Sequence, residues 1–257
     1  ADETPWKLLK KAPTKTWYVW GLRSEYGTYY HLADSRGQHV AKKLLGRYKG
    51  VLQTDGYVVY QTLARGSPDI VPAYCWAHVR RGFFEARLAY PQCERVLELI
   101  AALYAVERSL PAYRQLSAAE RVELIALRTA RRRAESAPLV AQILQWAEQQ
   151  EALPHSSLRK AITYMQNLWP GLVRFVDDGR IPLDTNAMER ELRGVVVGRK
   201  NHYGSKTERG TQVAAVFYSL LETAKHAGIP AHVYLRKAAE HALQNPGSFL
   251  LPHSLLP

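Results

Sequence analysis

The sequence has few cysteines and no long apolar run, and both absences narrow the class of protein. Only Cys75 and Cys93 occur among 257 residues, which excludes a disulfide-stapled scaffold and is typical of a reducing compartment. No apolar run approaches the roughly 20 residues that span a bilayer, and the first residues show no signal-peptide pattern. A glycine-rich phosphate loop of the nucleotide-binding type is also missing. We therefore expect a cytoplasmic chain without a membrane partner.

Basic residues, in contrast, are abundant. The chain carries 35 lysines and arginines against 23 acidic residues, a formal net charge of +12, and 47% of its residues are hydrophobic. This composition is typical of a globular protein with a buried core. The excess of positive charge favours a polyanionic partner, most simply a nucleic acid. The excess is largest in residues 1–91, at +7, and falls to +2 over 92–180 and +3 over 181–257.

The same three segments differ in their residue patterns. Residues 1–91 contain short aromatic and β-branched runs, such as 16–22 and 27–33, that predict strands. Helical spacing between them completes an α/β order with an antiparallel hairpin at its start. Residues 92–180 carry apolar side chains at helical spacing, which predicts an inserted all-helical block. Residues 181–257 are predicted to be helical again. Loop signals in the block are expected at Pro111, Pro138 and Pro154.

Three acidic residues stand at positions where a carboxylate could reach a ligand. Asp2 precedes an apolar stretch, Asp55 ends a hydrophobic run, and Glu189 lies near the start of a predicted helix. If they converge, their oxygens would hold Mg²⁺ or Mn²⁺, which select such donors. Each position also has an ordinary interpretation. Asp2 can be a solvated terminal acid, Asp55-Gly56 can be a turn, and Asn186 with Glu189 can form a capping box.

Several motifs occur together in one order along the chain. They are Ala-Asp-Glu-Thr-Pro5, Trp-Tyr-Val-Trp-Gly21, Ala-Asp-Ser-Arg36, Val-Leu-Gln-Thr-Asp-Gly-Tyr57, Cys-Trp-Ala-His-Val-Arg-Arg81, Asn-Ala-Met-Glu-Arg190 and Gly-Arg-Lys-Asn201. In this order they resemble the transposases of the bacterial insertion-sequence family numbered sixty-six. The resemblance extends from the first residue to about Leu235. Members usually continue upstream with DNA-binding segments, so we expect a portion to precede Ala1.

The resemblance implies a ribonuclease-H-like mixed sheet, interrupted by an all-α insertion and followed by C-terminal helices. It places a DDE triad, which would hold two Mg²⁺ or Mn²⁺ ions, on Asp2, Asp55 and Glu189. The implied activity is metal-dependent DNA cleavage and strand transfer, in a nucleoid-associated homo-oligomer, with accessory transposition proteins. A nuclease that only hydrolyses DNA and an inactive DNA-binding remnant are the alternatives. Nearby acids that could compete for the site are Glu3, Asp34, Asp184 and Glu191. Asp2 and Glu3 would face opposite sides of a strand, so only one of the two can join it.

Basic residues near these acids are candidates for contacts with DNA phosphates. Those expected to bind DNA are Arg190, Arg193, Arg199, Lys200, Lys206 and Arg209. His78, Arg80 and Arg81 are candidates for a further phosphate contact.

Several other motifs could be functional, but we interpret them as structural. Cys75 and His78 form a single Cys-x-x-His pair, whereas structural zinc normally uses two spaced pairs, so we interpret Cys75 as a buried small hydrophobe. The run Arg131-Arg132-Arg133 is interpreted as a solvated helix face. Trp17 and Trp20 are expected in sheet packing, and Trp146 and Trp169 in the helical core.

Overall fold

The computed structural model describes residues 1–9, 15–111 and 116–255, and these form two compact units. The first unit joins Ala1–Leu45 to Asn186–Pro257, and the second comprises Gly46–Thr185. The boundaries of these two units differ from those of the predicted segments 1–91, 92–180 and 181–257. The division into three segments stays a prediction. Within the described ranges, no helix is both long enough and apolar enough to cross a membrane.

The first unit is built on an antiparallel sheet in the order β1 (Asp2–Leu8), β2 (Lys15–Arg23) and β3 (Thr28–Ala33). Aromatic and β-branched residues favour these strands, and a turn closed by the Ser24 amide and the Gly27 carbonyl at 2.9 Å joins β2 to β3. The remaining elements of the unit are α1 (Gln38–Leu45), α8 (Asn186–His202), α9 (Glu208–His226), α10 (Ala231–Gln244) and η3 (Pro252–Leu255).

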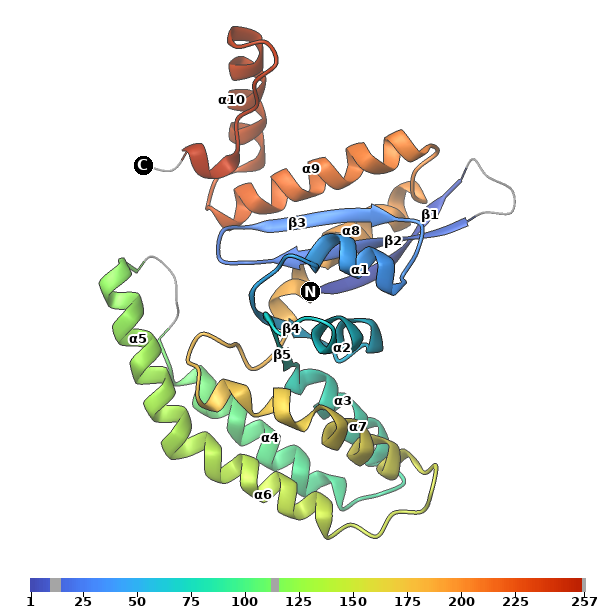
Figure 1. Cartoon of the computed structure of the whole chain (residues 1–257), viewed down its shortest axis with the longest axis vertical. Helices are drawn as coiled ribbons and strands as arrows, with labels where there is room; N and C mark the ends of the chain where they lie inside the picture. The colour runs from blue at the N-terminus through green and yellow to red at the C-terminus, as the bar shows by residue number, and fades with distance from the viewer. Residues whose placement is uncertain (10–14, 112–115, 256–257) are drawn as a thin grey trace. The chain divides into compact units, whose positions relative to one another are not determined.

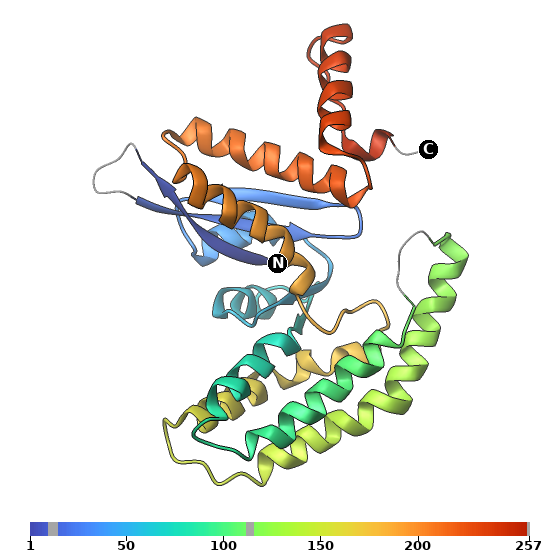
Figure 2. The ribbon, with the colours of Figure 1, turned by 180° about the vertical axis from the view of Figure 1, so that it is seen from behind.

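Helices α8 and α9 share one face of this sheet (Figures 1 and 2). Trp6 and Val19 from the strands pack with Met188 and Val195 of α8 and Ala215 of α9. Helix α8 runs without interruption from Asn186 to His202. The absence of a side chain at the glycines of α8 leaves room for side chains of neighbouring elements. A Cβ at Gly198 would lie 2.1 Å from the Tyr218 hydroxyl of α9.

The second unit begins with a parallel pair, β4 (Gly50–Thr54) and β5 (Ile70–Tyr74), joined by α2 (Val58–Arg65). Such a pair requires a crossover connection, which the helix supplies. The unit continues with α3 (Trp76–Ala86), α4 (Cys93–Arg108), α5 (Ala118–Arg131), η1 (Arg132–Ser136), α6 (Ala137–Glu148), α7 (Ser157–Leu172) and η2 (Arg174–Val176). The core runs from β5 through α3, α4, α6 and α7 (Figure 1).

Two local predictions in the helical segment are wrong. Pro138 does not lie in a loop, because α5, the π-helical turn η1 and α6 follow one another without a break and Pro138 is the second residue of α6. The π-helical turn directly before it already interrupts the regular α-helical pairing, so a residue without an amide hydrogen is tolerated there. Arg132 is not solvated, because its side chain is fully buried against Glu107. Trp146 and Trp169 do pack in the core, against Phe83 and Trp76.

The predicted mixed α/β class is confirmed. Among the described residues the strands form two sheets, one antiparallel with three strands and one parallel with two. A single ribonuclease-H-like sheet therefore remains a proposal.

Candidate active site

Asp2 lies on β1, on the face of the sheet that α8 covers. Its partner across the strand pair is Gly21, and paired residues point to the same face. A Cβ at Gly21 would meet the terminal methyl of Met188 on α8 at 2.5 Å. Gly21 therefore lies directly beneath the first turn of α8. Asp2 and the turn that carries Glu189 share this side of the first unit.

The competing acid Glu3 points the other way. Its carboxylate is 2.6 Å from the guanidinium of Arg36, and its side chain is only 1% exposed. The alternation of side chains along a strand thus separates the two neighbouring acids. Of the two, Asp2 is the one on the side of α8.

Glu189 lies in the first turn of α8 and is half-buried. The second competitor on this helix, Glu191, is held within the fold. One of its carboxylate oxygens is 2.7 Å from Nε of Arg23, and the other accepts a hydrogen bond from the Thr28 hydroxyl. Glu191 therefore anchors α8 to the sheet. A helical rotation of about 100° per residue places Glu189 on the flank between the buried and exposed faces.

Asp55 directly follows β4 in the second unit. Its Oδ1 accepts a hydrogen bond from the Tyr57 amide at 2.8 Å, and Gly56 has φ +88. A Cβ at Gly56 would lie 2.5 Å from Leu168, so both conformation and space require glycine. The predicted turn is confirmed. It holds the Asp55 carboxylate at the carboxyl end of β4, where a ligand can approach.

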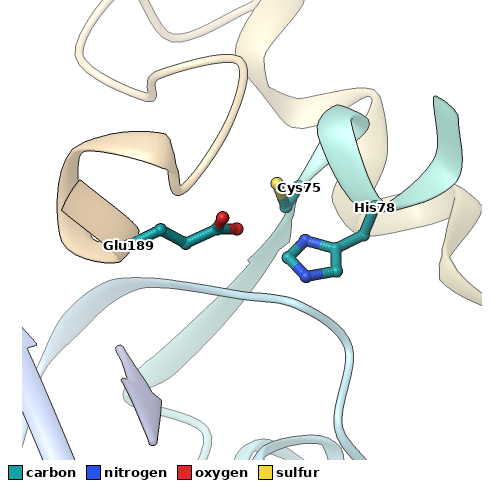
Figure 3. A group of neighbouring side chains, drawn as sticks. All are labelled: Cys75, His78 and Glu189. Atoms are coloured by element: carbon teal, nitrogen blue, oxygen red, sulfur yellow. The ribbon is translucent and has the colours of Figure 1, made fainter. Parts of the chain in front are cut away.

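Cys75 and His78 occupy the same edge of the second unit. Thr54 pairs with Tyr74, so Asp55 and Cys75 directly follow neighbouring residues of the two strands. Cys75 is 1% exposed, as predicted, and its Sγ lies within 4.8 Å of a ring nitrogen of His78. Figure 3 shows Cys75 at the junction of β5 and α3, His78 on the first turn of α3, and Glu189 on α8. The Cys-x-x-His pair supplies two ligands, short of the four that structural zinc uses.

The segment 182–185, which leads to α8, is tied to this edge by three hydrogen bonds. The Gln53 side-chain amide donates to the Pro182 carbonyl at 2.6 Å. The Trp76 amide donates to the Leu183 carbonyl at 3.1 Å, and the Thr185 amide donates to Cys75 Sγ at 3.3 Å. The last residue of the second unit is therefore fixed beside the carboxyl ends of β4 and β5.

Two half-buried tyrosines complete this edge. The Tyr164 hydroxyl donates to the Asp55 carbonyl, and burial, followed by the charge of Asp55, raises its pKa well above the ordinary value. Burial and the adjacent Asp184 raise the pKa of Tyr104 in the same way. Both hydroxyls therefore stay protonated, and that of Tyr164 acts as a donor. Sequence reasoning missed Tyr164 and Thr185, because neither stands in an acidic or basic motif and the tertiary fold alone brings them to the edge.

The basic residues expected to bind DNA divide into two groups. Arg190, Arg193, Lys200, Lys206 and Arg209 are exposed. Arg199 is not available in the same way, because its guanidinium donates to the Thr4 hydroxyl at 2.9 Å and to the Pro5 carbonyl. It holds α8 against β1. In the second unit Arg80 and Arg81 are exposed on α3, and His78 is half-buried.

Comparison with known proteins adds independent information. Residues 1–213 match the family model described as "Transposase IS66 family". Three uncharacterized proteins of Sinorhizobium fredii (strain NBRC 101917 / NGR234) are similar. The protein y4jD is 31% identical over 265 residues, with 100% of this chain and 47% of the relative covered. The protein y4hP is 32% identical over 248 residues, with 89% of this chain and 43% of the relative covered. The protein y4qI is 30% identical over 248 residues, with 89% and 44% covered. The chain thus spans less than half the length of these relatives. No solved structure matches.

Proposed function

Because this chain belongs to the IS66 family of transposases, we propose that it is the catalytic region of a transposase that cuts DNA at the ends of an insertion sequence and joins them to a target. Asp2, Asp55 and Glu189 are the proposed catalytic acids. We further propose that the strands together adopt a ribonuclease-H-like arrangement, and that the active species is a homo-oligomer, because two element ends are handled in one reaction. Accessory proteins are proposed partners on the same family basis.

The observation that carries this proposal is the attachment of segment 182–185 beside Asp55. The Thr185 amide donates a hydrogen bond to Cys75. Cys75 and Asp55 lie side by side, because each directly follows one member of the strand pair Tyr74 and Thr54. Adjacent strands lie about 4.8 Å apart. Glu189 follows Thr185 by four residues, a helical rise of ~6 Å. Chain connectivity therefore supports a shared role for Asp55 and Glu189, although 134 positions separate them in sequence.

Asp2 is included because it lies on the sheet face that α8 covers, as derived above from Gly21 and Met188. Two of the competitors in the first unit are less suited. Glu3 is held by Arg36 and Glu191 by Arg23. The donors that this set offers are carboxylate oxygens, which fit Mg²⁺ or Mn²⁺ better than softer metals.

Two bound divalent ions would supply an activated water or 3′-hydroxyl and would stabilise the leaving oxygen. The chain's own residues have three tasks in this scheme. The three carboxylates hold the ions, and the Asx turn at Asp55 fixes one of these ligands. Exposed Arg190, Arg193 and Lys200 bind backbone phosphates. Lys206, Arg209, His78, Arg80 and Arg81 are proposed to contact phosphates as well. Cleavage and joining are both in-line displacements at phosphorus, so no covalent link between protein and DNA forms.

The test is cleavage and joining of labelled element-end DNA with Mg²⁺ or Mn²⁺. We expect Asp2→Asn, Asp55→Asn and Glu189→Gln each to abolish the metal-dependent products. Asn at position 55 can keep the bond to the Tyr57 amide, so the turn survives. The matched control is Asp69→Asn. Asp69 lies at the opposite end of the same strand pair, beside Lys49 at 3.1 Å, and its loss should leave the reaction unchanged.

The products decide between the alternatives. Joined molecules support a transposase, nicks alone support a hydrolytic nuclease, and DNA binding without any metal-dependent product supports an inactive remnant. Full activity of Asp55→Asn or Glu189→Gln would overturn the site assignment.

A further inference from the structure

Tyr203 has an unusual combination of conformation and exposure. It directly follows α8 and has φ +61. This is the left-handed region, in which residues other than glycine are uncommon. Its side chain is 71% exposed, so burial of the ring in the core does not offset the unfavourable energy of this conformation. A backbone outlier with an exposed aromatic ring is a reason to look for a ligand.

The backbone on both sides of Tyr203 is fixed to β1. Before it, the His202 ring packs on Trp6 with centroids 5.5 Å apart. After it, a Cβ at Gly204 would lie 2.2 Å from the Lys7 carbonyl. The Ser205 amide donates to that carbonyl at 3.0 Å, and the Ser205 carbonyl accepts from the Leu9 amide at 2.9 Å. These contacts hold Tyr203 at the apex of an anchored turn and direct its ring away from the core.

The surroundings of Tyr203 are strongly basic. Five basic residues and a single acid, Glu208, occur between Glu191 and Glu222. Of these, Lys200, Lys206 and Arg209 are exposed and lie within six positions of Tyr203. An aromatic ring among exposed cations is the arrangement by which proteins bind single-stranded nucleic acid, with bases stacked on the ring and phosphates on the cations.

We propose that Tyr203 stacks on an unpaired base of the DNA substrate. The ring is presented by a turn that is already ordered, so little conformational entropy is lost on binding. The ligand is thus a DNA strand with at least one unstacked base, while the neighbouring lysines and arginine contact its backbone. This inference rests on the proposed function, because it assumes that DNA is the substrate.

The experiment compares two labelled probes of the same sequence, a blunt duplex and a duplex with a short single-stranded tail, by fluorescence anisotropy. We expect the chain to bind the tailed probe more tightly. Tyr203→Leu should weaken binding to the tailed probe roughly ten-fold and leave blunt-duplex binding unchanged, while Tyr203→Phe keeps the preference. The matched control is Tyr26→Leu. Tyr26 is 79% exposed on the β2–β3 turn, and its replacement should change neither affinity.

Two further measurements separate stacking from a structural role. A 2-aminopurine in the tail should be quenched by the unsubstituted chain and not by Tyr203→Leu. Tyr203→Gly should raise the melting temperature, because glycine suits φ +61, and yet lose the preference for the tail. A lowered melting temperature in Tyr203→Gly would overturn the proposal, because the ring would then be a packing residue.

Failures of the two proposals give different results. If blunt-duplex binding is intact but Tyr203→Leu and Tyr26→Leu behave alike, stacking by Tyr203 is overturned and the proposed function stands. If the chain binds neither probe, DNA binding itself is overturned and the role of Tyr203 falls with it.

Discussion

The Thr185 amide donates a hydrogen bond to the Sγ of Cys75 at 3.3 Å. Because Thr185 directly precedes α8, this contact fixes the chain where the helix that carries Glu189 begins. A residue expected only as a small buried hydrophobe thus also acts as an acceptor. We regard Cys75 as a positioning residue for the proposed acid.

Replacing Cys75 tests this relationship. Serine at 75 offers an oxygen acceptor and should retain metal-dependent cleavage within about three-fold. Alanine lacks an acceptor and should lower metal-dependent cleavage about five-fold, the value of one hydrogen bond of ~1 kcal/mol. It should also shift the Mg²⁺ midpoint upward, because Glu189 is held less well. Cleavage is measured against Mg²⁺ concentration, with circular dichroism as the folding control. Equal behaviour of the two variants would remove the positioning role.

The two glutamates of α8 should separate stability from activity. Glu191→Ala removes the partner of Arg23 and Thr28 and should destabilise the chain by about 1–3 kcal/mol. Glu189→Gln should change the free energy of unfolding far less while abolishing metal-dependent products. Urea unfolding and the cleavage assay are run on both variants. The reverse pattern would exchange the roles assigned to the two residues.

Arg132 should be a stability residue of the second unit. Its fully buried side chain contacts Glu107 at 2.7 Å and donates to the Phe175 carbonyl at 2.9 Å. Arg132→Met leaves Glu107 without this partner, and removing one member of a buried pair costs about 3–5 kcal/mol. The matched control is Arg133→Met, whose arginine is 63% exposed beside Asp177 and should matter by less than about 0.5 kcal/mol. Equal midpoints in urea would contradict this assignment.

Replacing Arg193 should change DNA affinity, whereas replacing Arg199 should change stability. Arg193→Gln should weaken duplex binding and reduce the slope of log affinity against log salt by about 0.9, as expected for one lost phosphate contact. Arg199→Gln should mainly lower the melting temperature, because its guanidinium holds β1. Arg236→Gln, an exposed arginine of α10, is the control. An unchanged salt slope for Arg193→Gln would remove it from the DNA surface.

His31 should make the first unit less stable in mild acid. Burial, followed by the charge of Lys43, lowers the pKa of His31 below its ordinary 6.5. The folded state therefore binds the proton less readily than the unfolded chain. Its contribution to stability is present above the unfolded pKa and is lost as pH falls below about 6.5. His31→Gln should flatten the dependence of the unfolding free energy between about pH 7 and 5. Parallel curves for the two proteins would exclude His31 as the cause.

Much of the local structure could be predicted from sequence, because period and turn chemistry act over a few residues. The strands around Trp17 and Tyr30 and the turn at Asp55-Gly56 are confirmed. The errors occurred where a distant partner decides. Arg132, in a run of three arginines, looks solvated until the fold places Glu107 beside it.

The sequence by itself determined the α/β class, the basic character and the ordered motifs that indicate the transposase family, since these depend on composition and local order. Only the tertiary structure decided which acid of each neighbouring pair is held within the fold. Glu3 and Glu191 meet Arg36 and Arg23 across 33 and 168 positions, while Cys75 holds Thr185 across 110. Such pairings are set by the packing of separate elements, which no local pattern encodes.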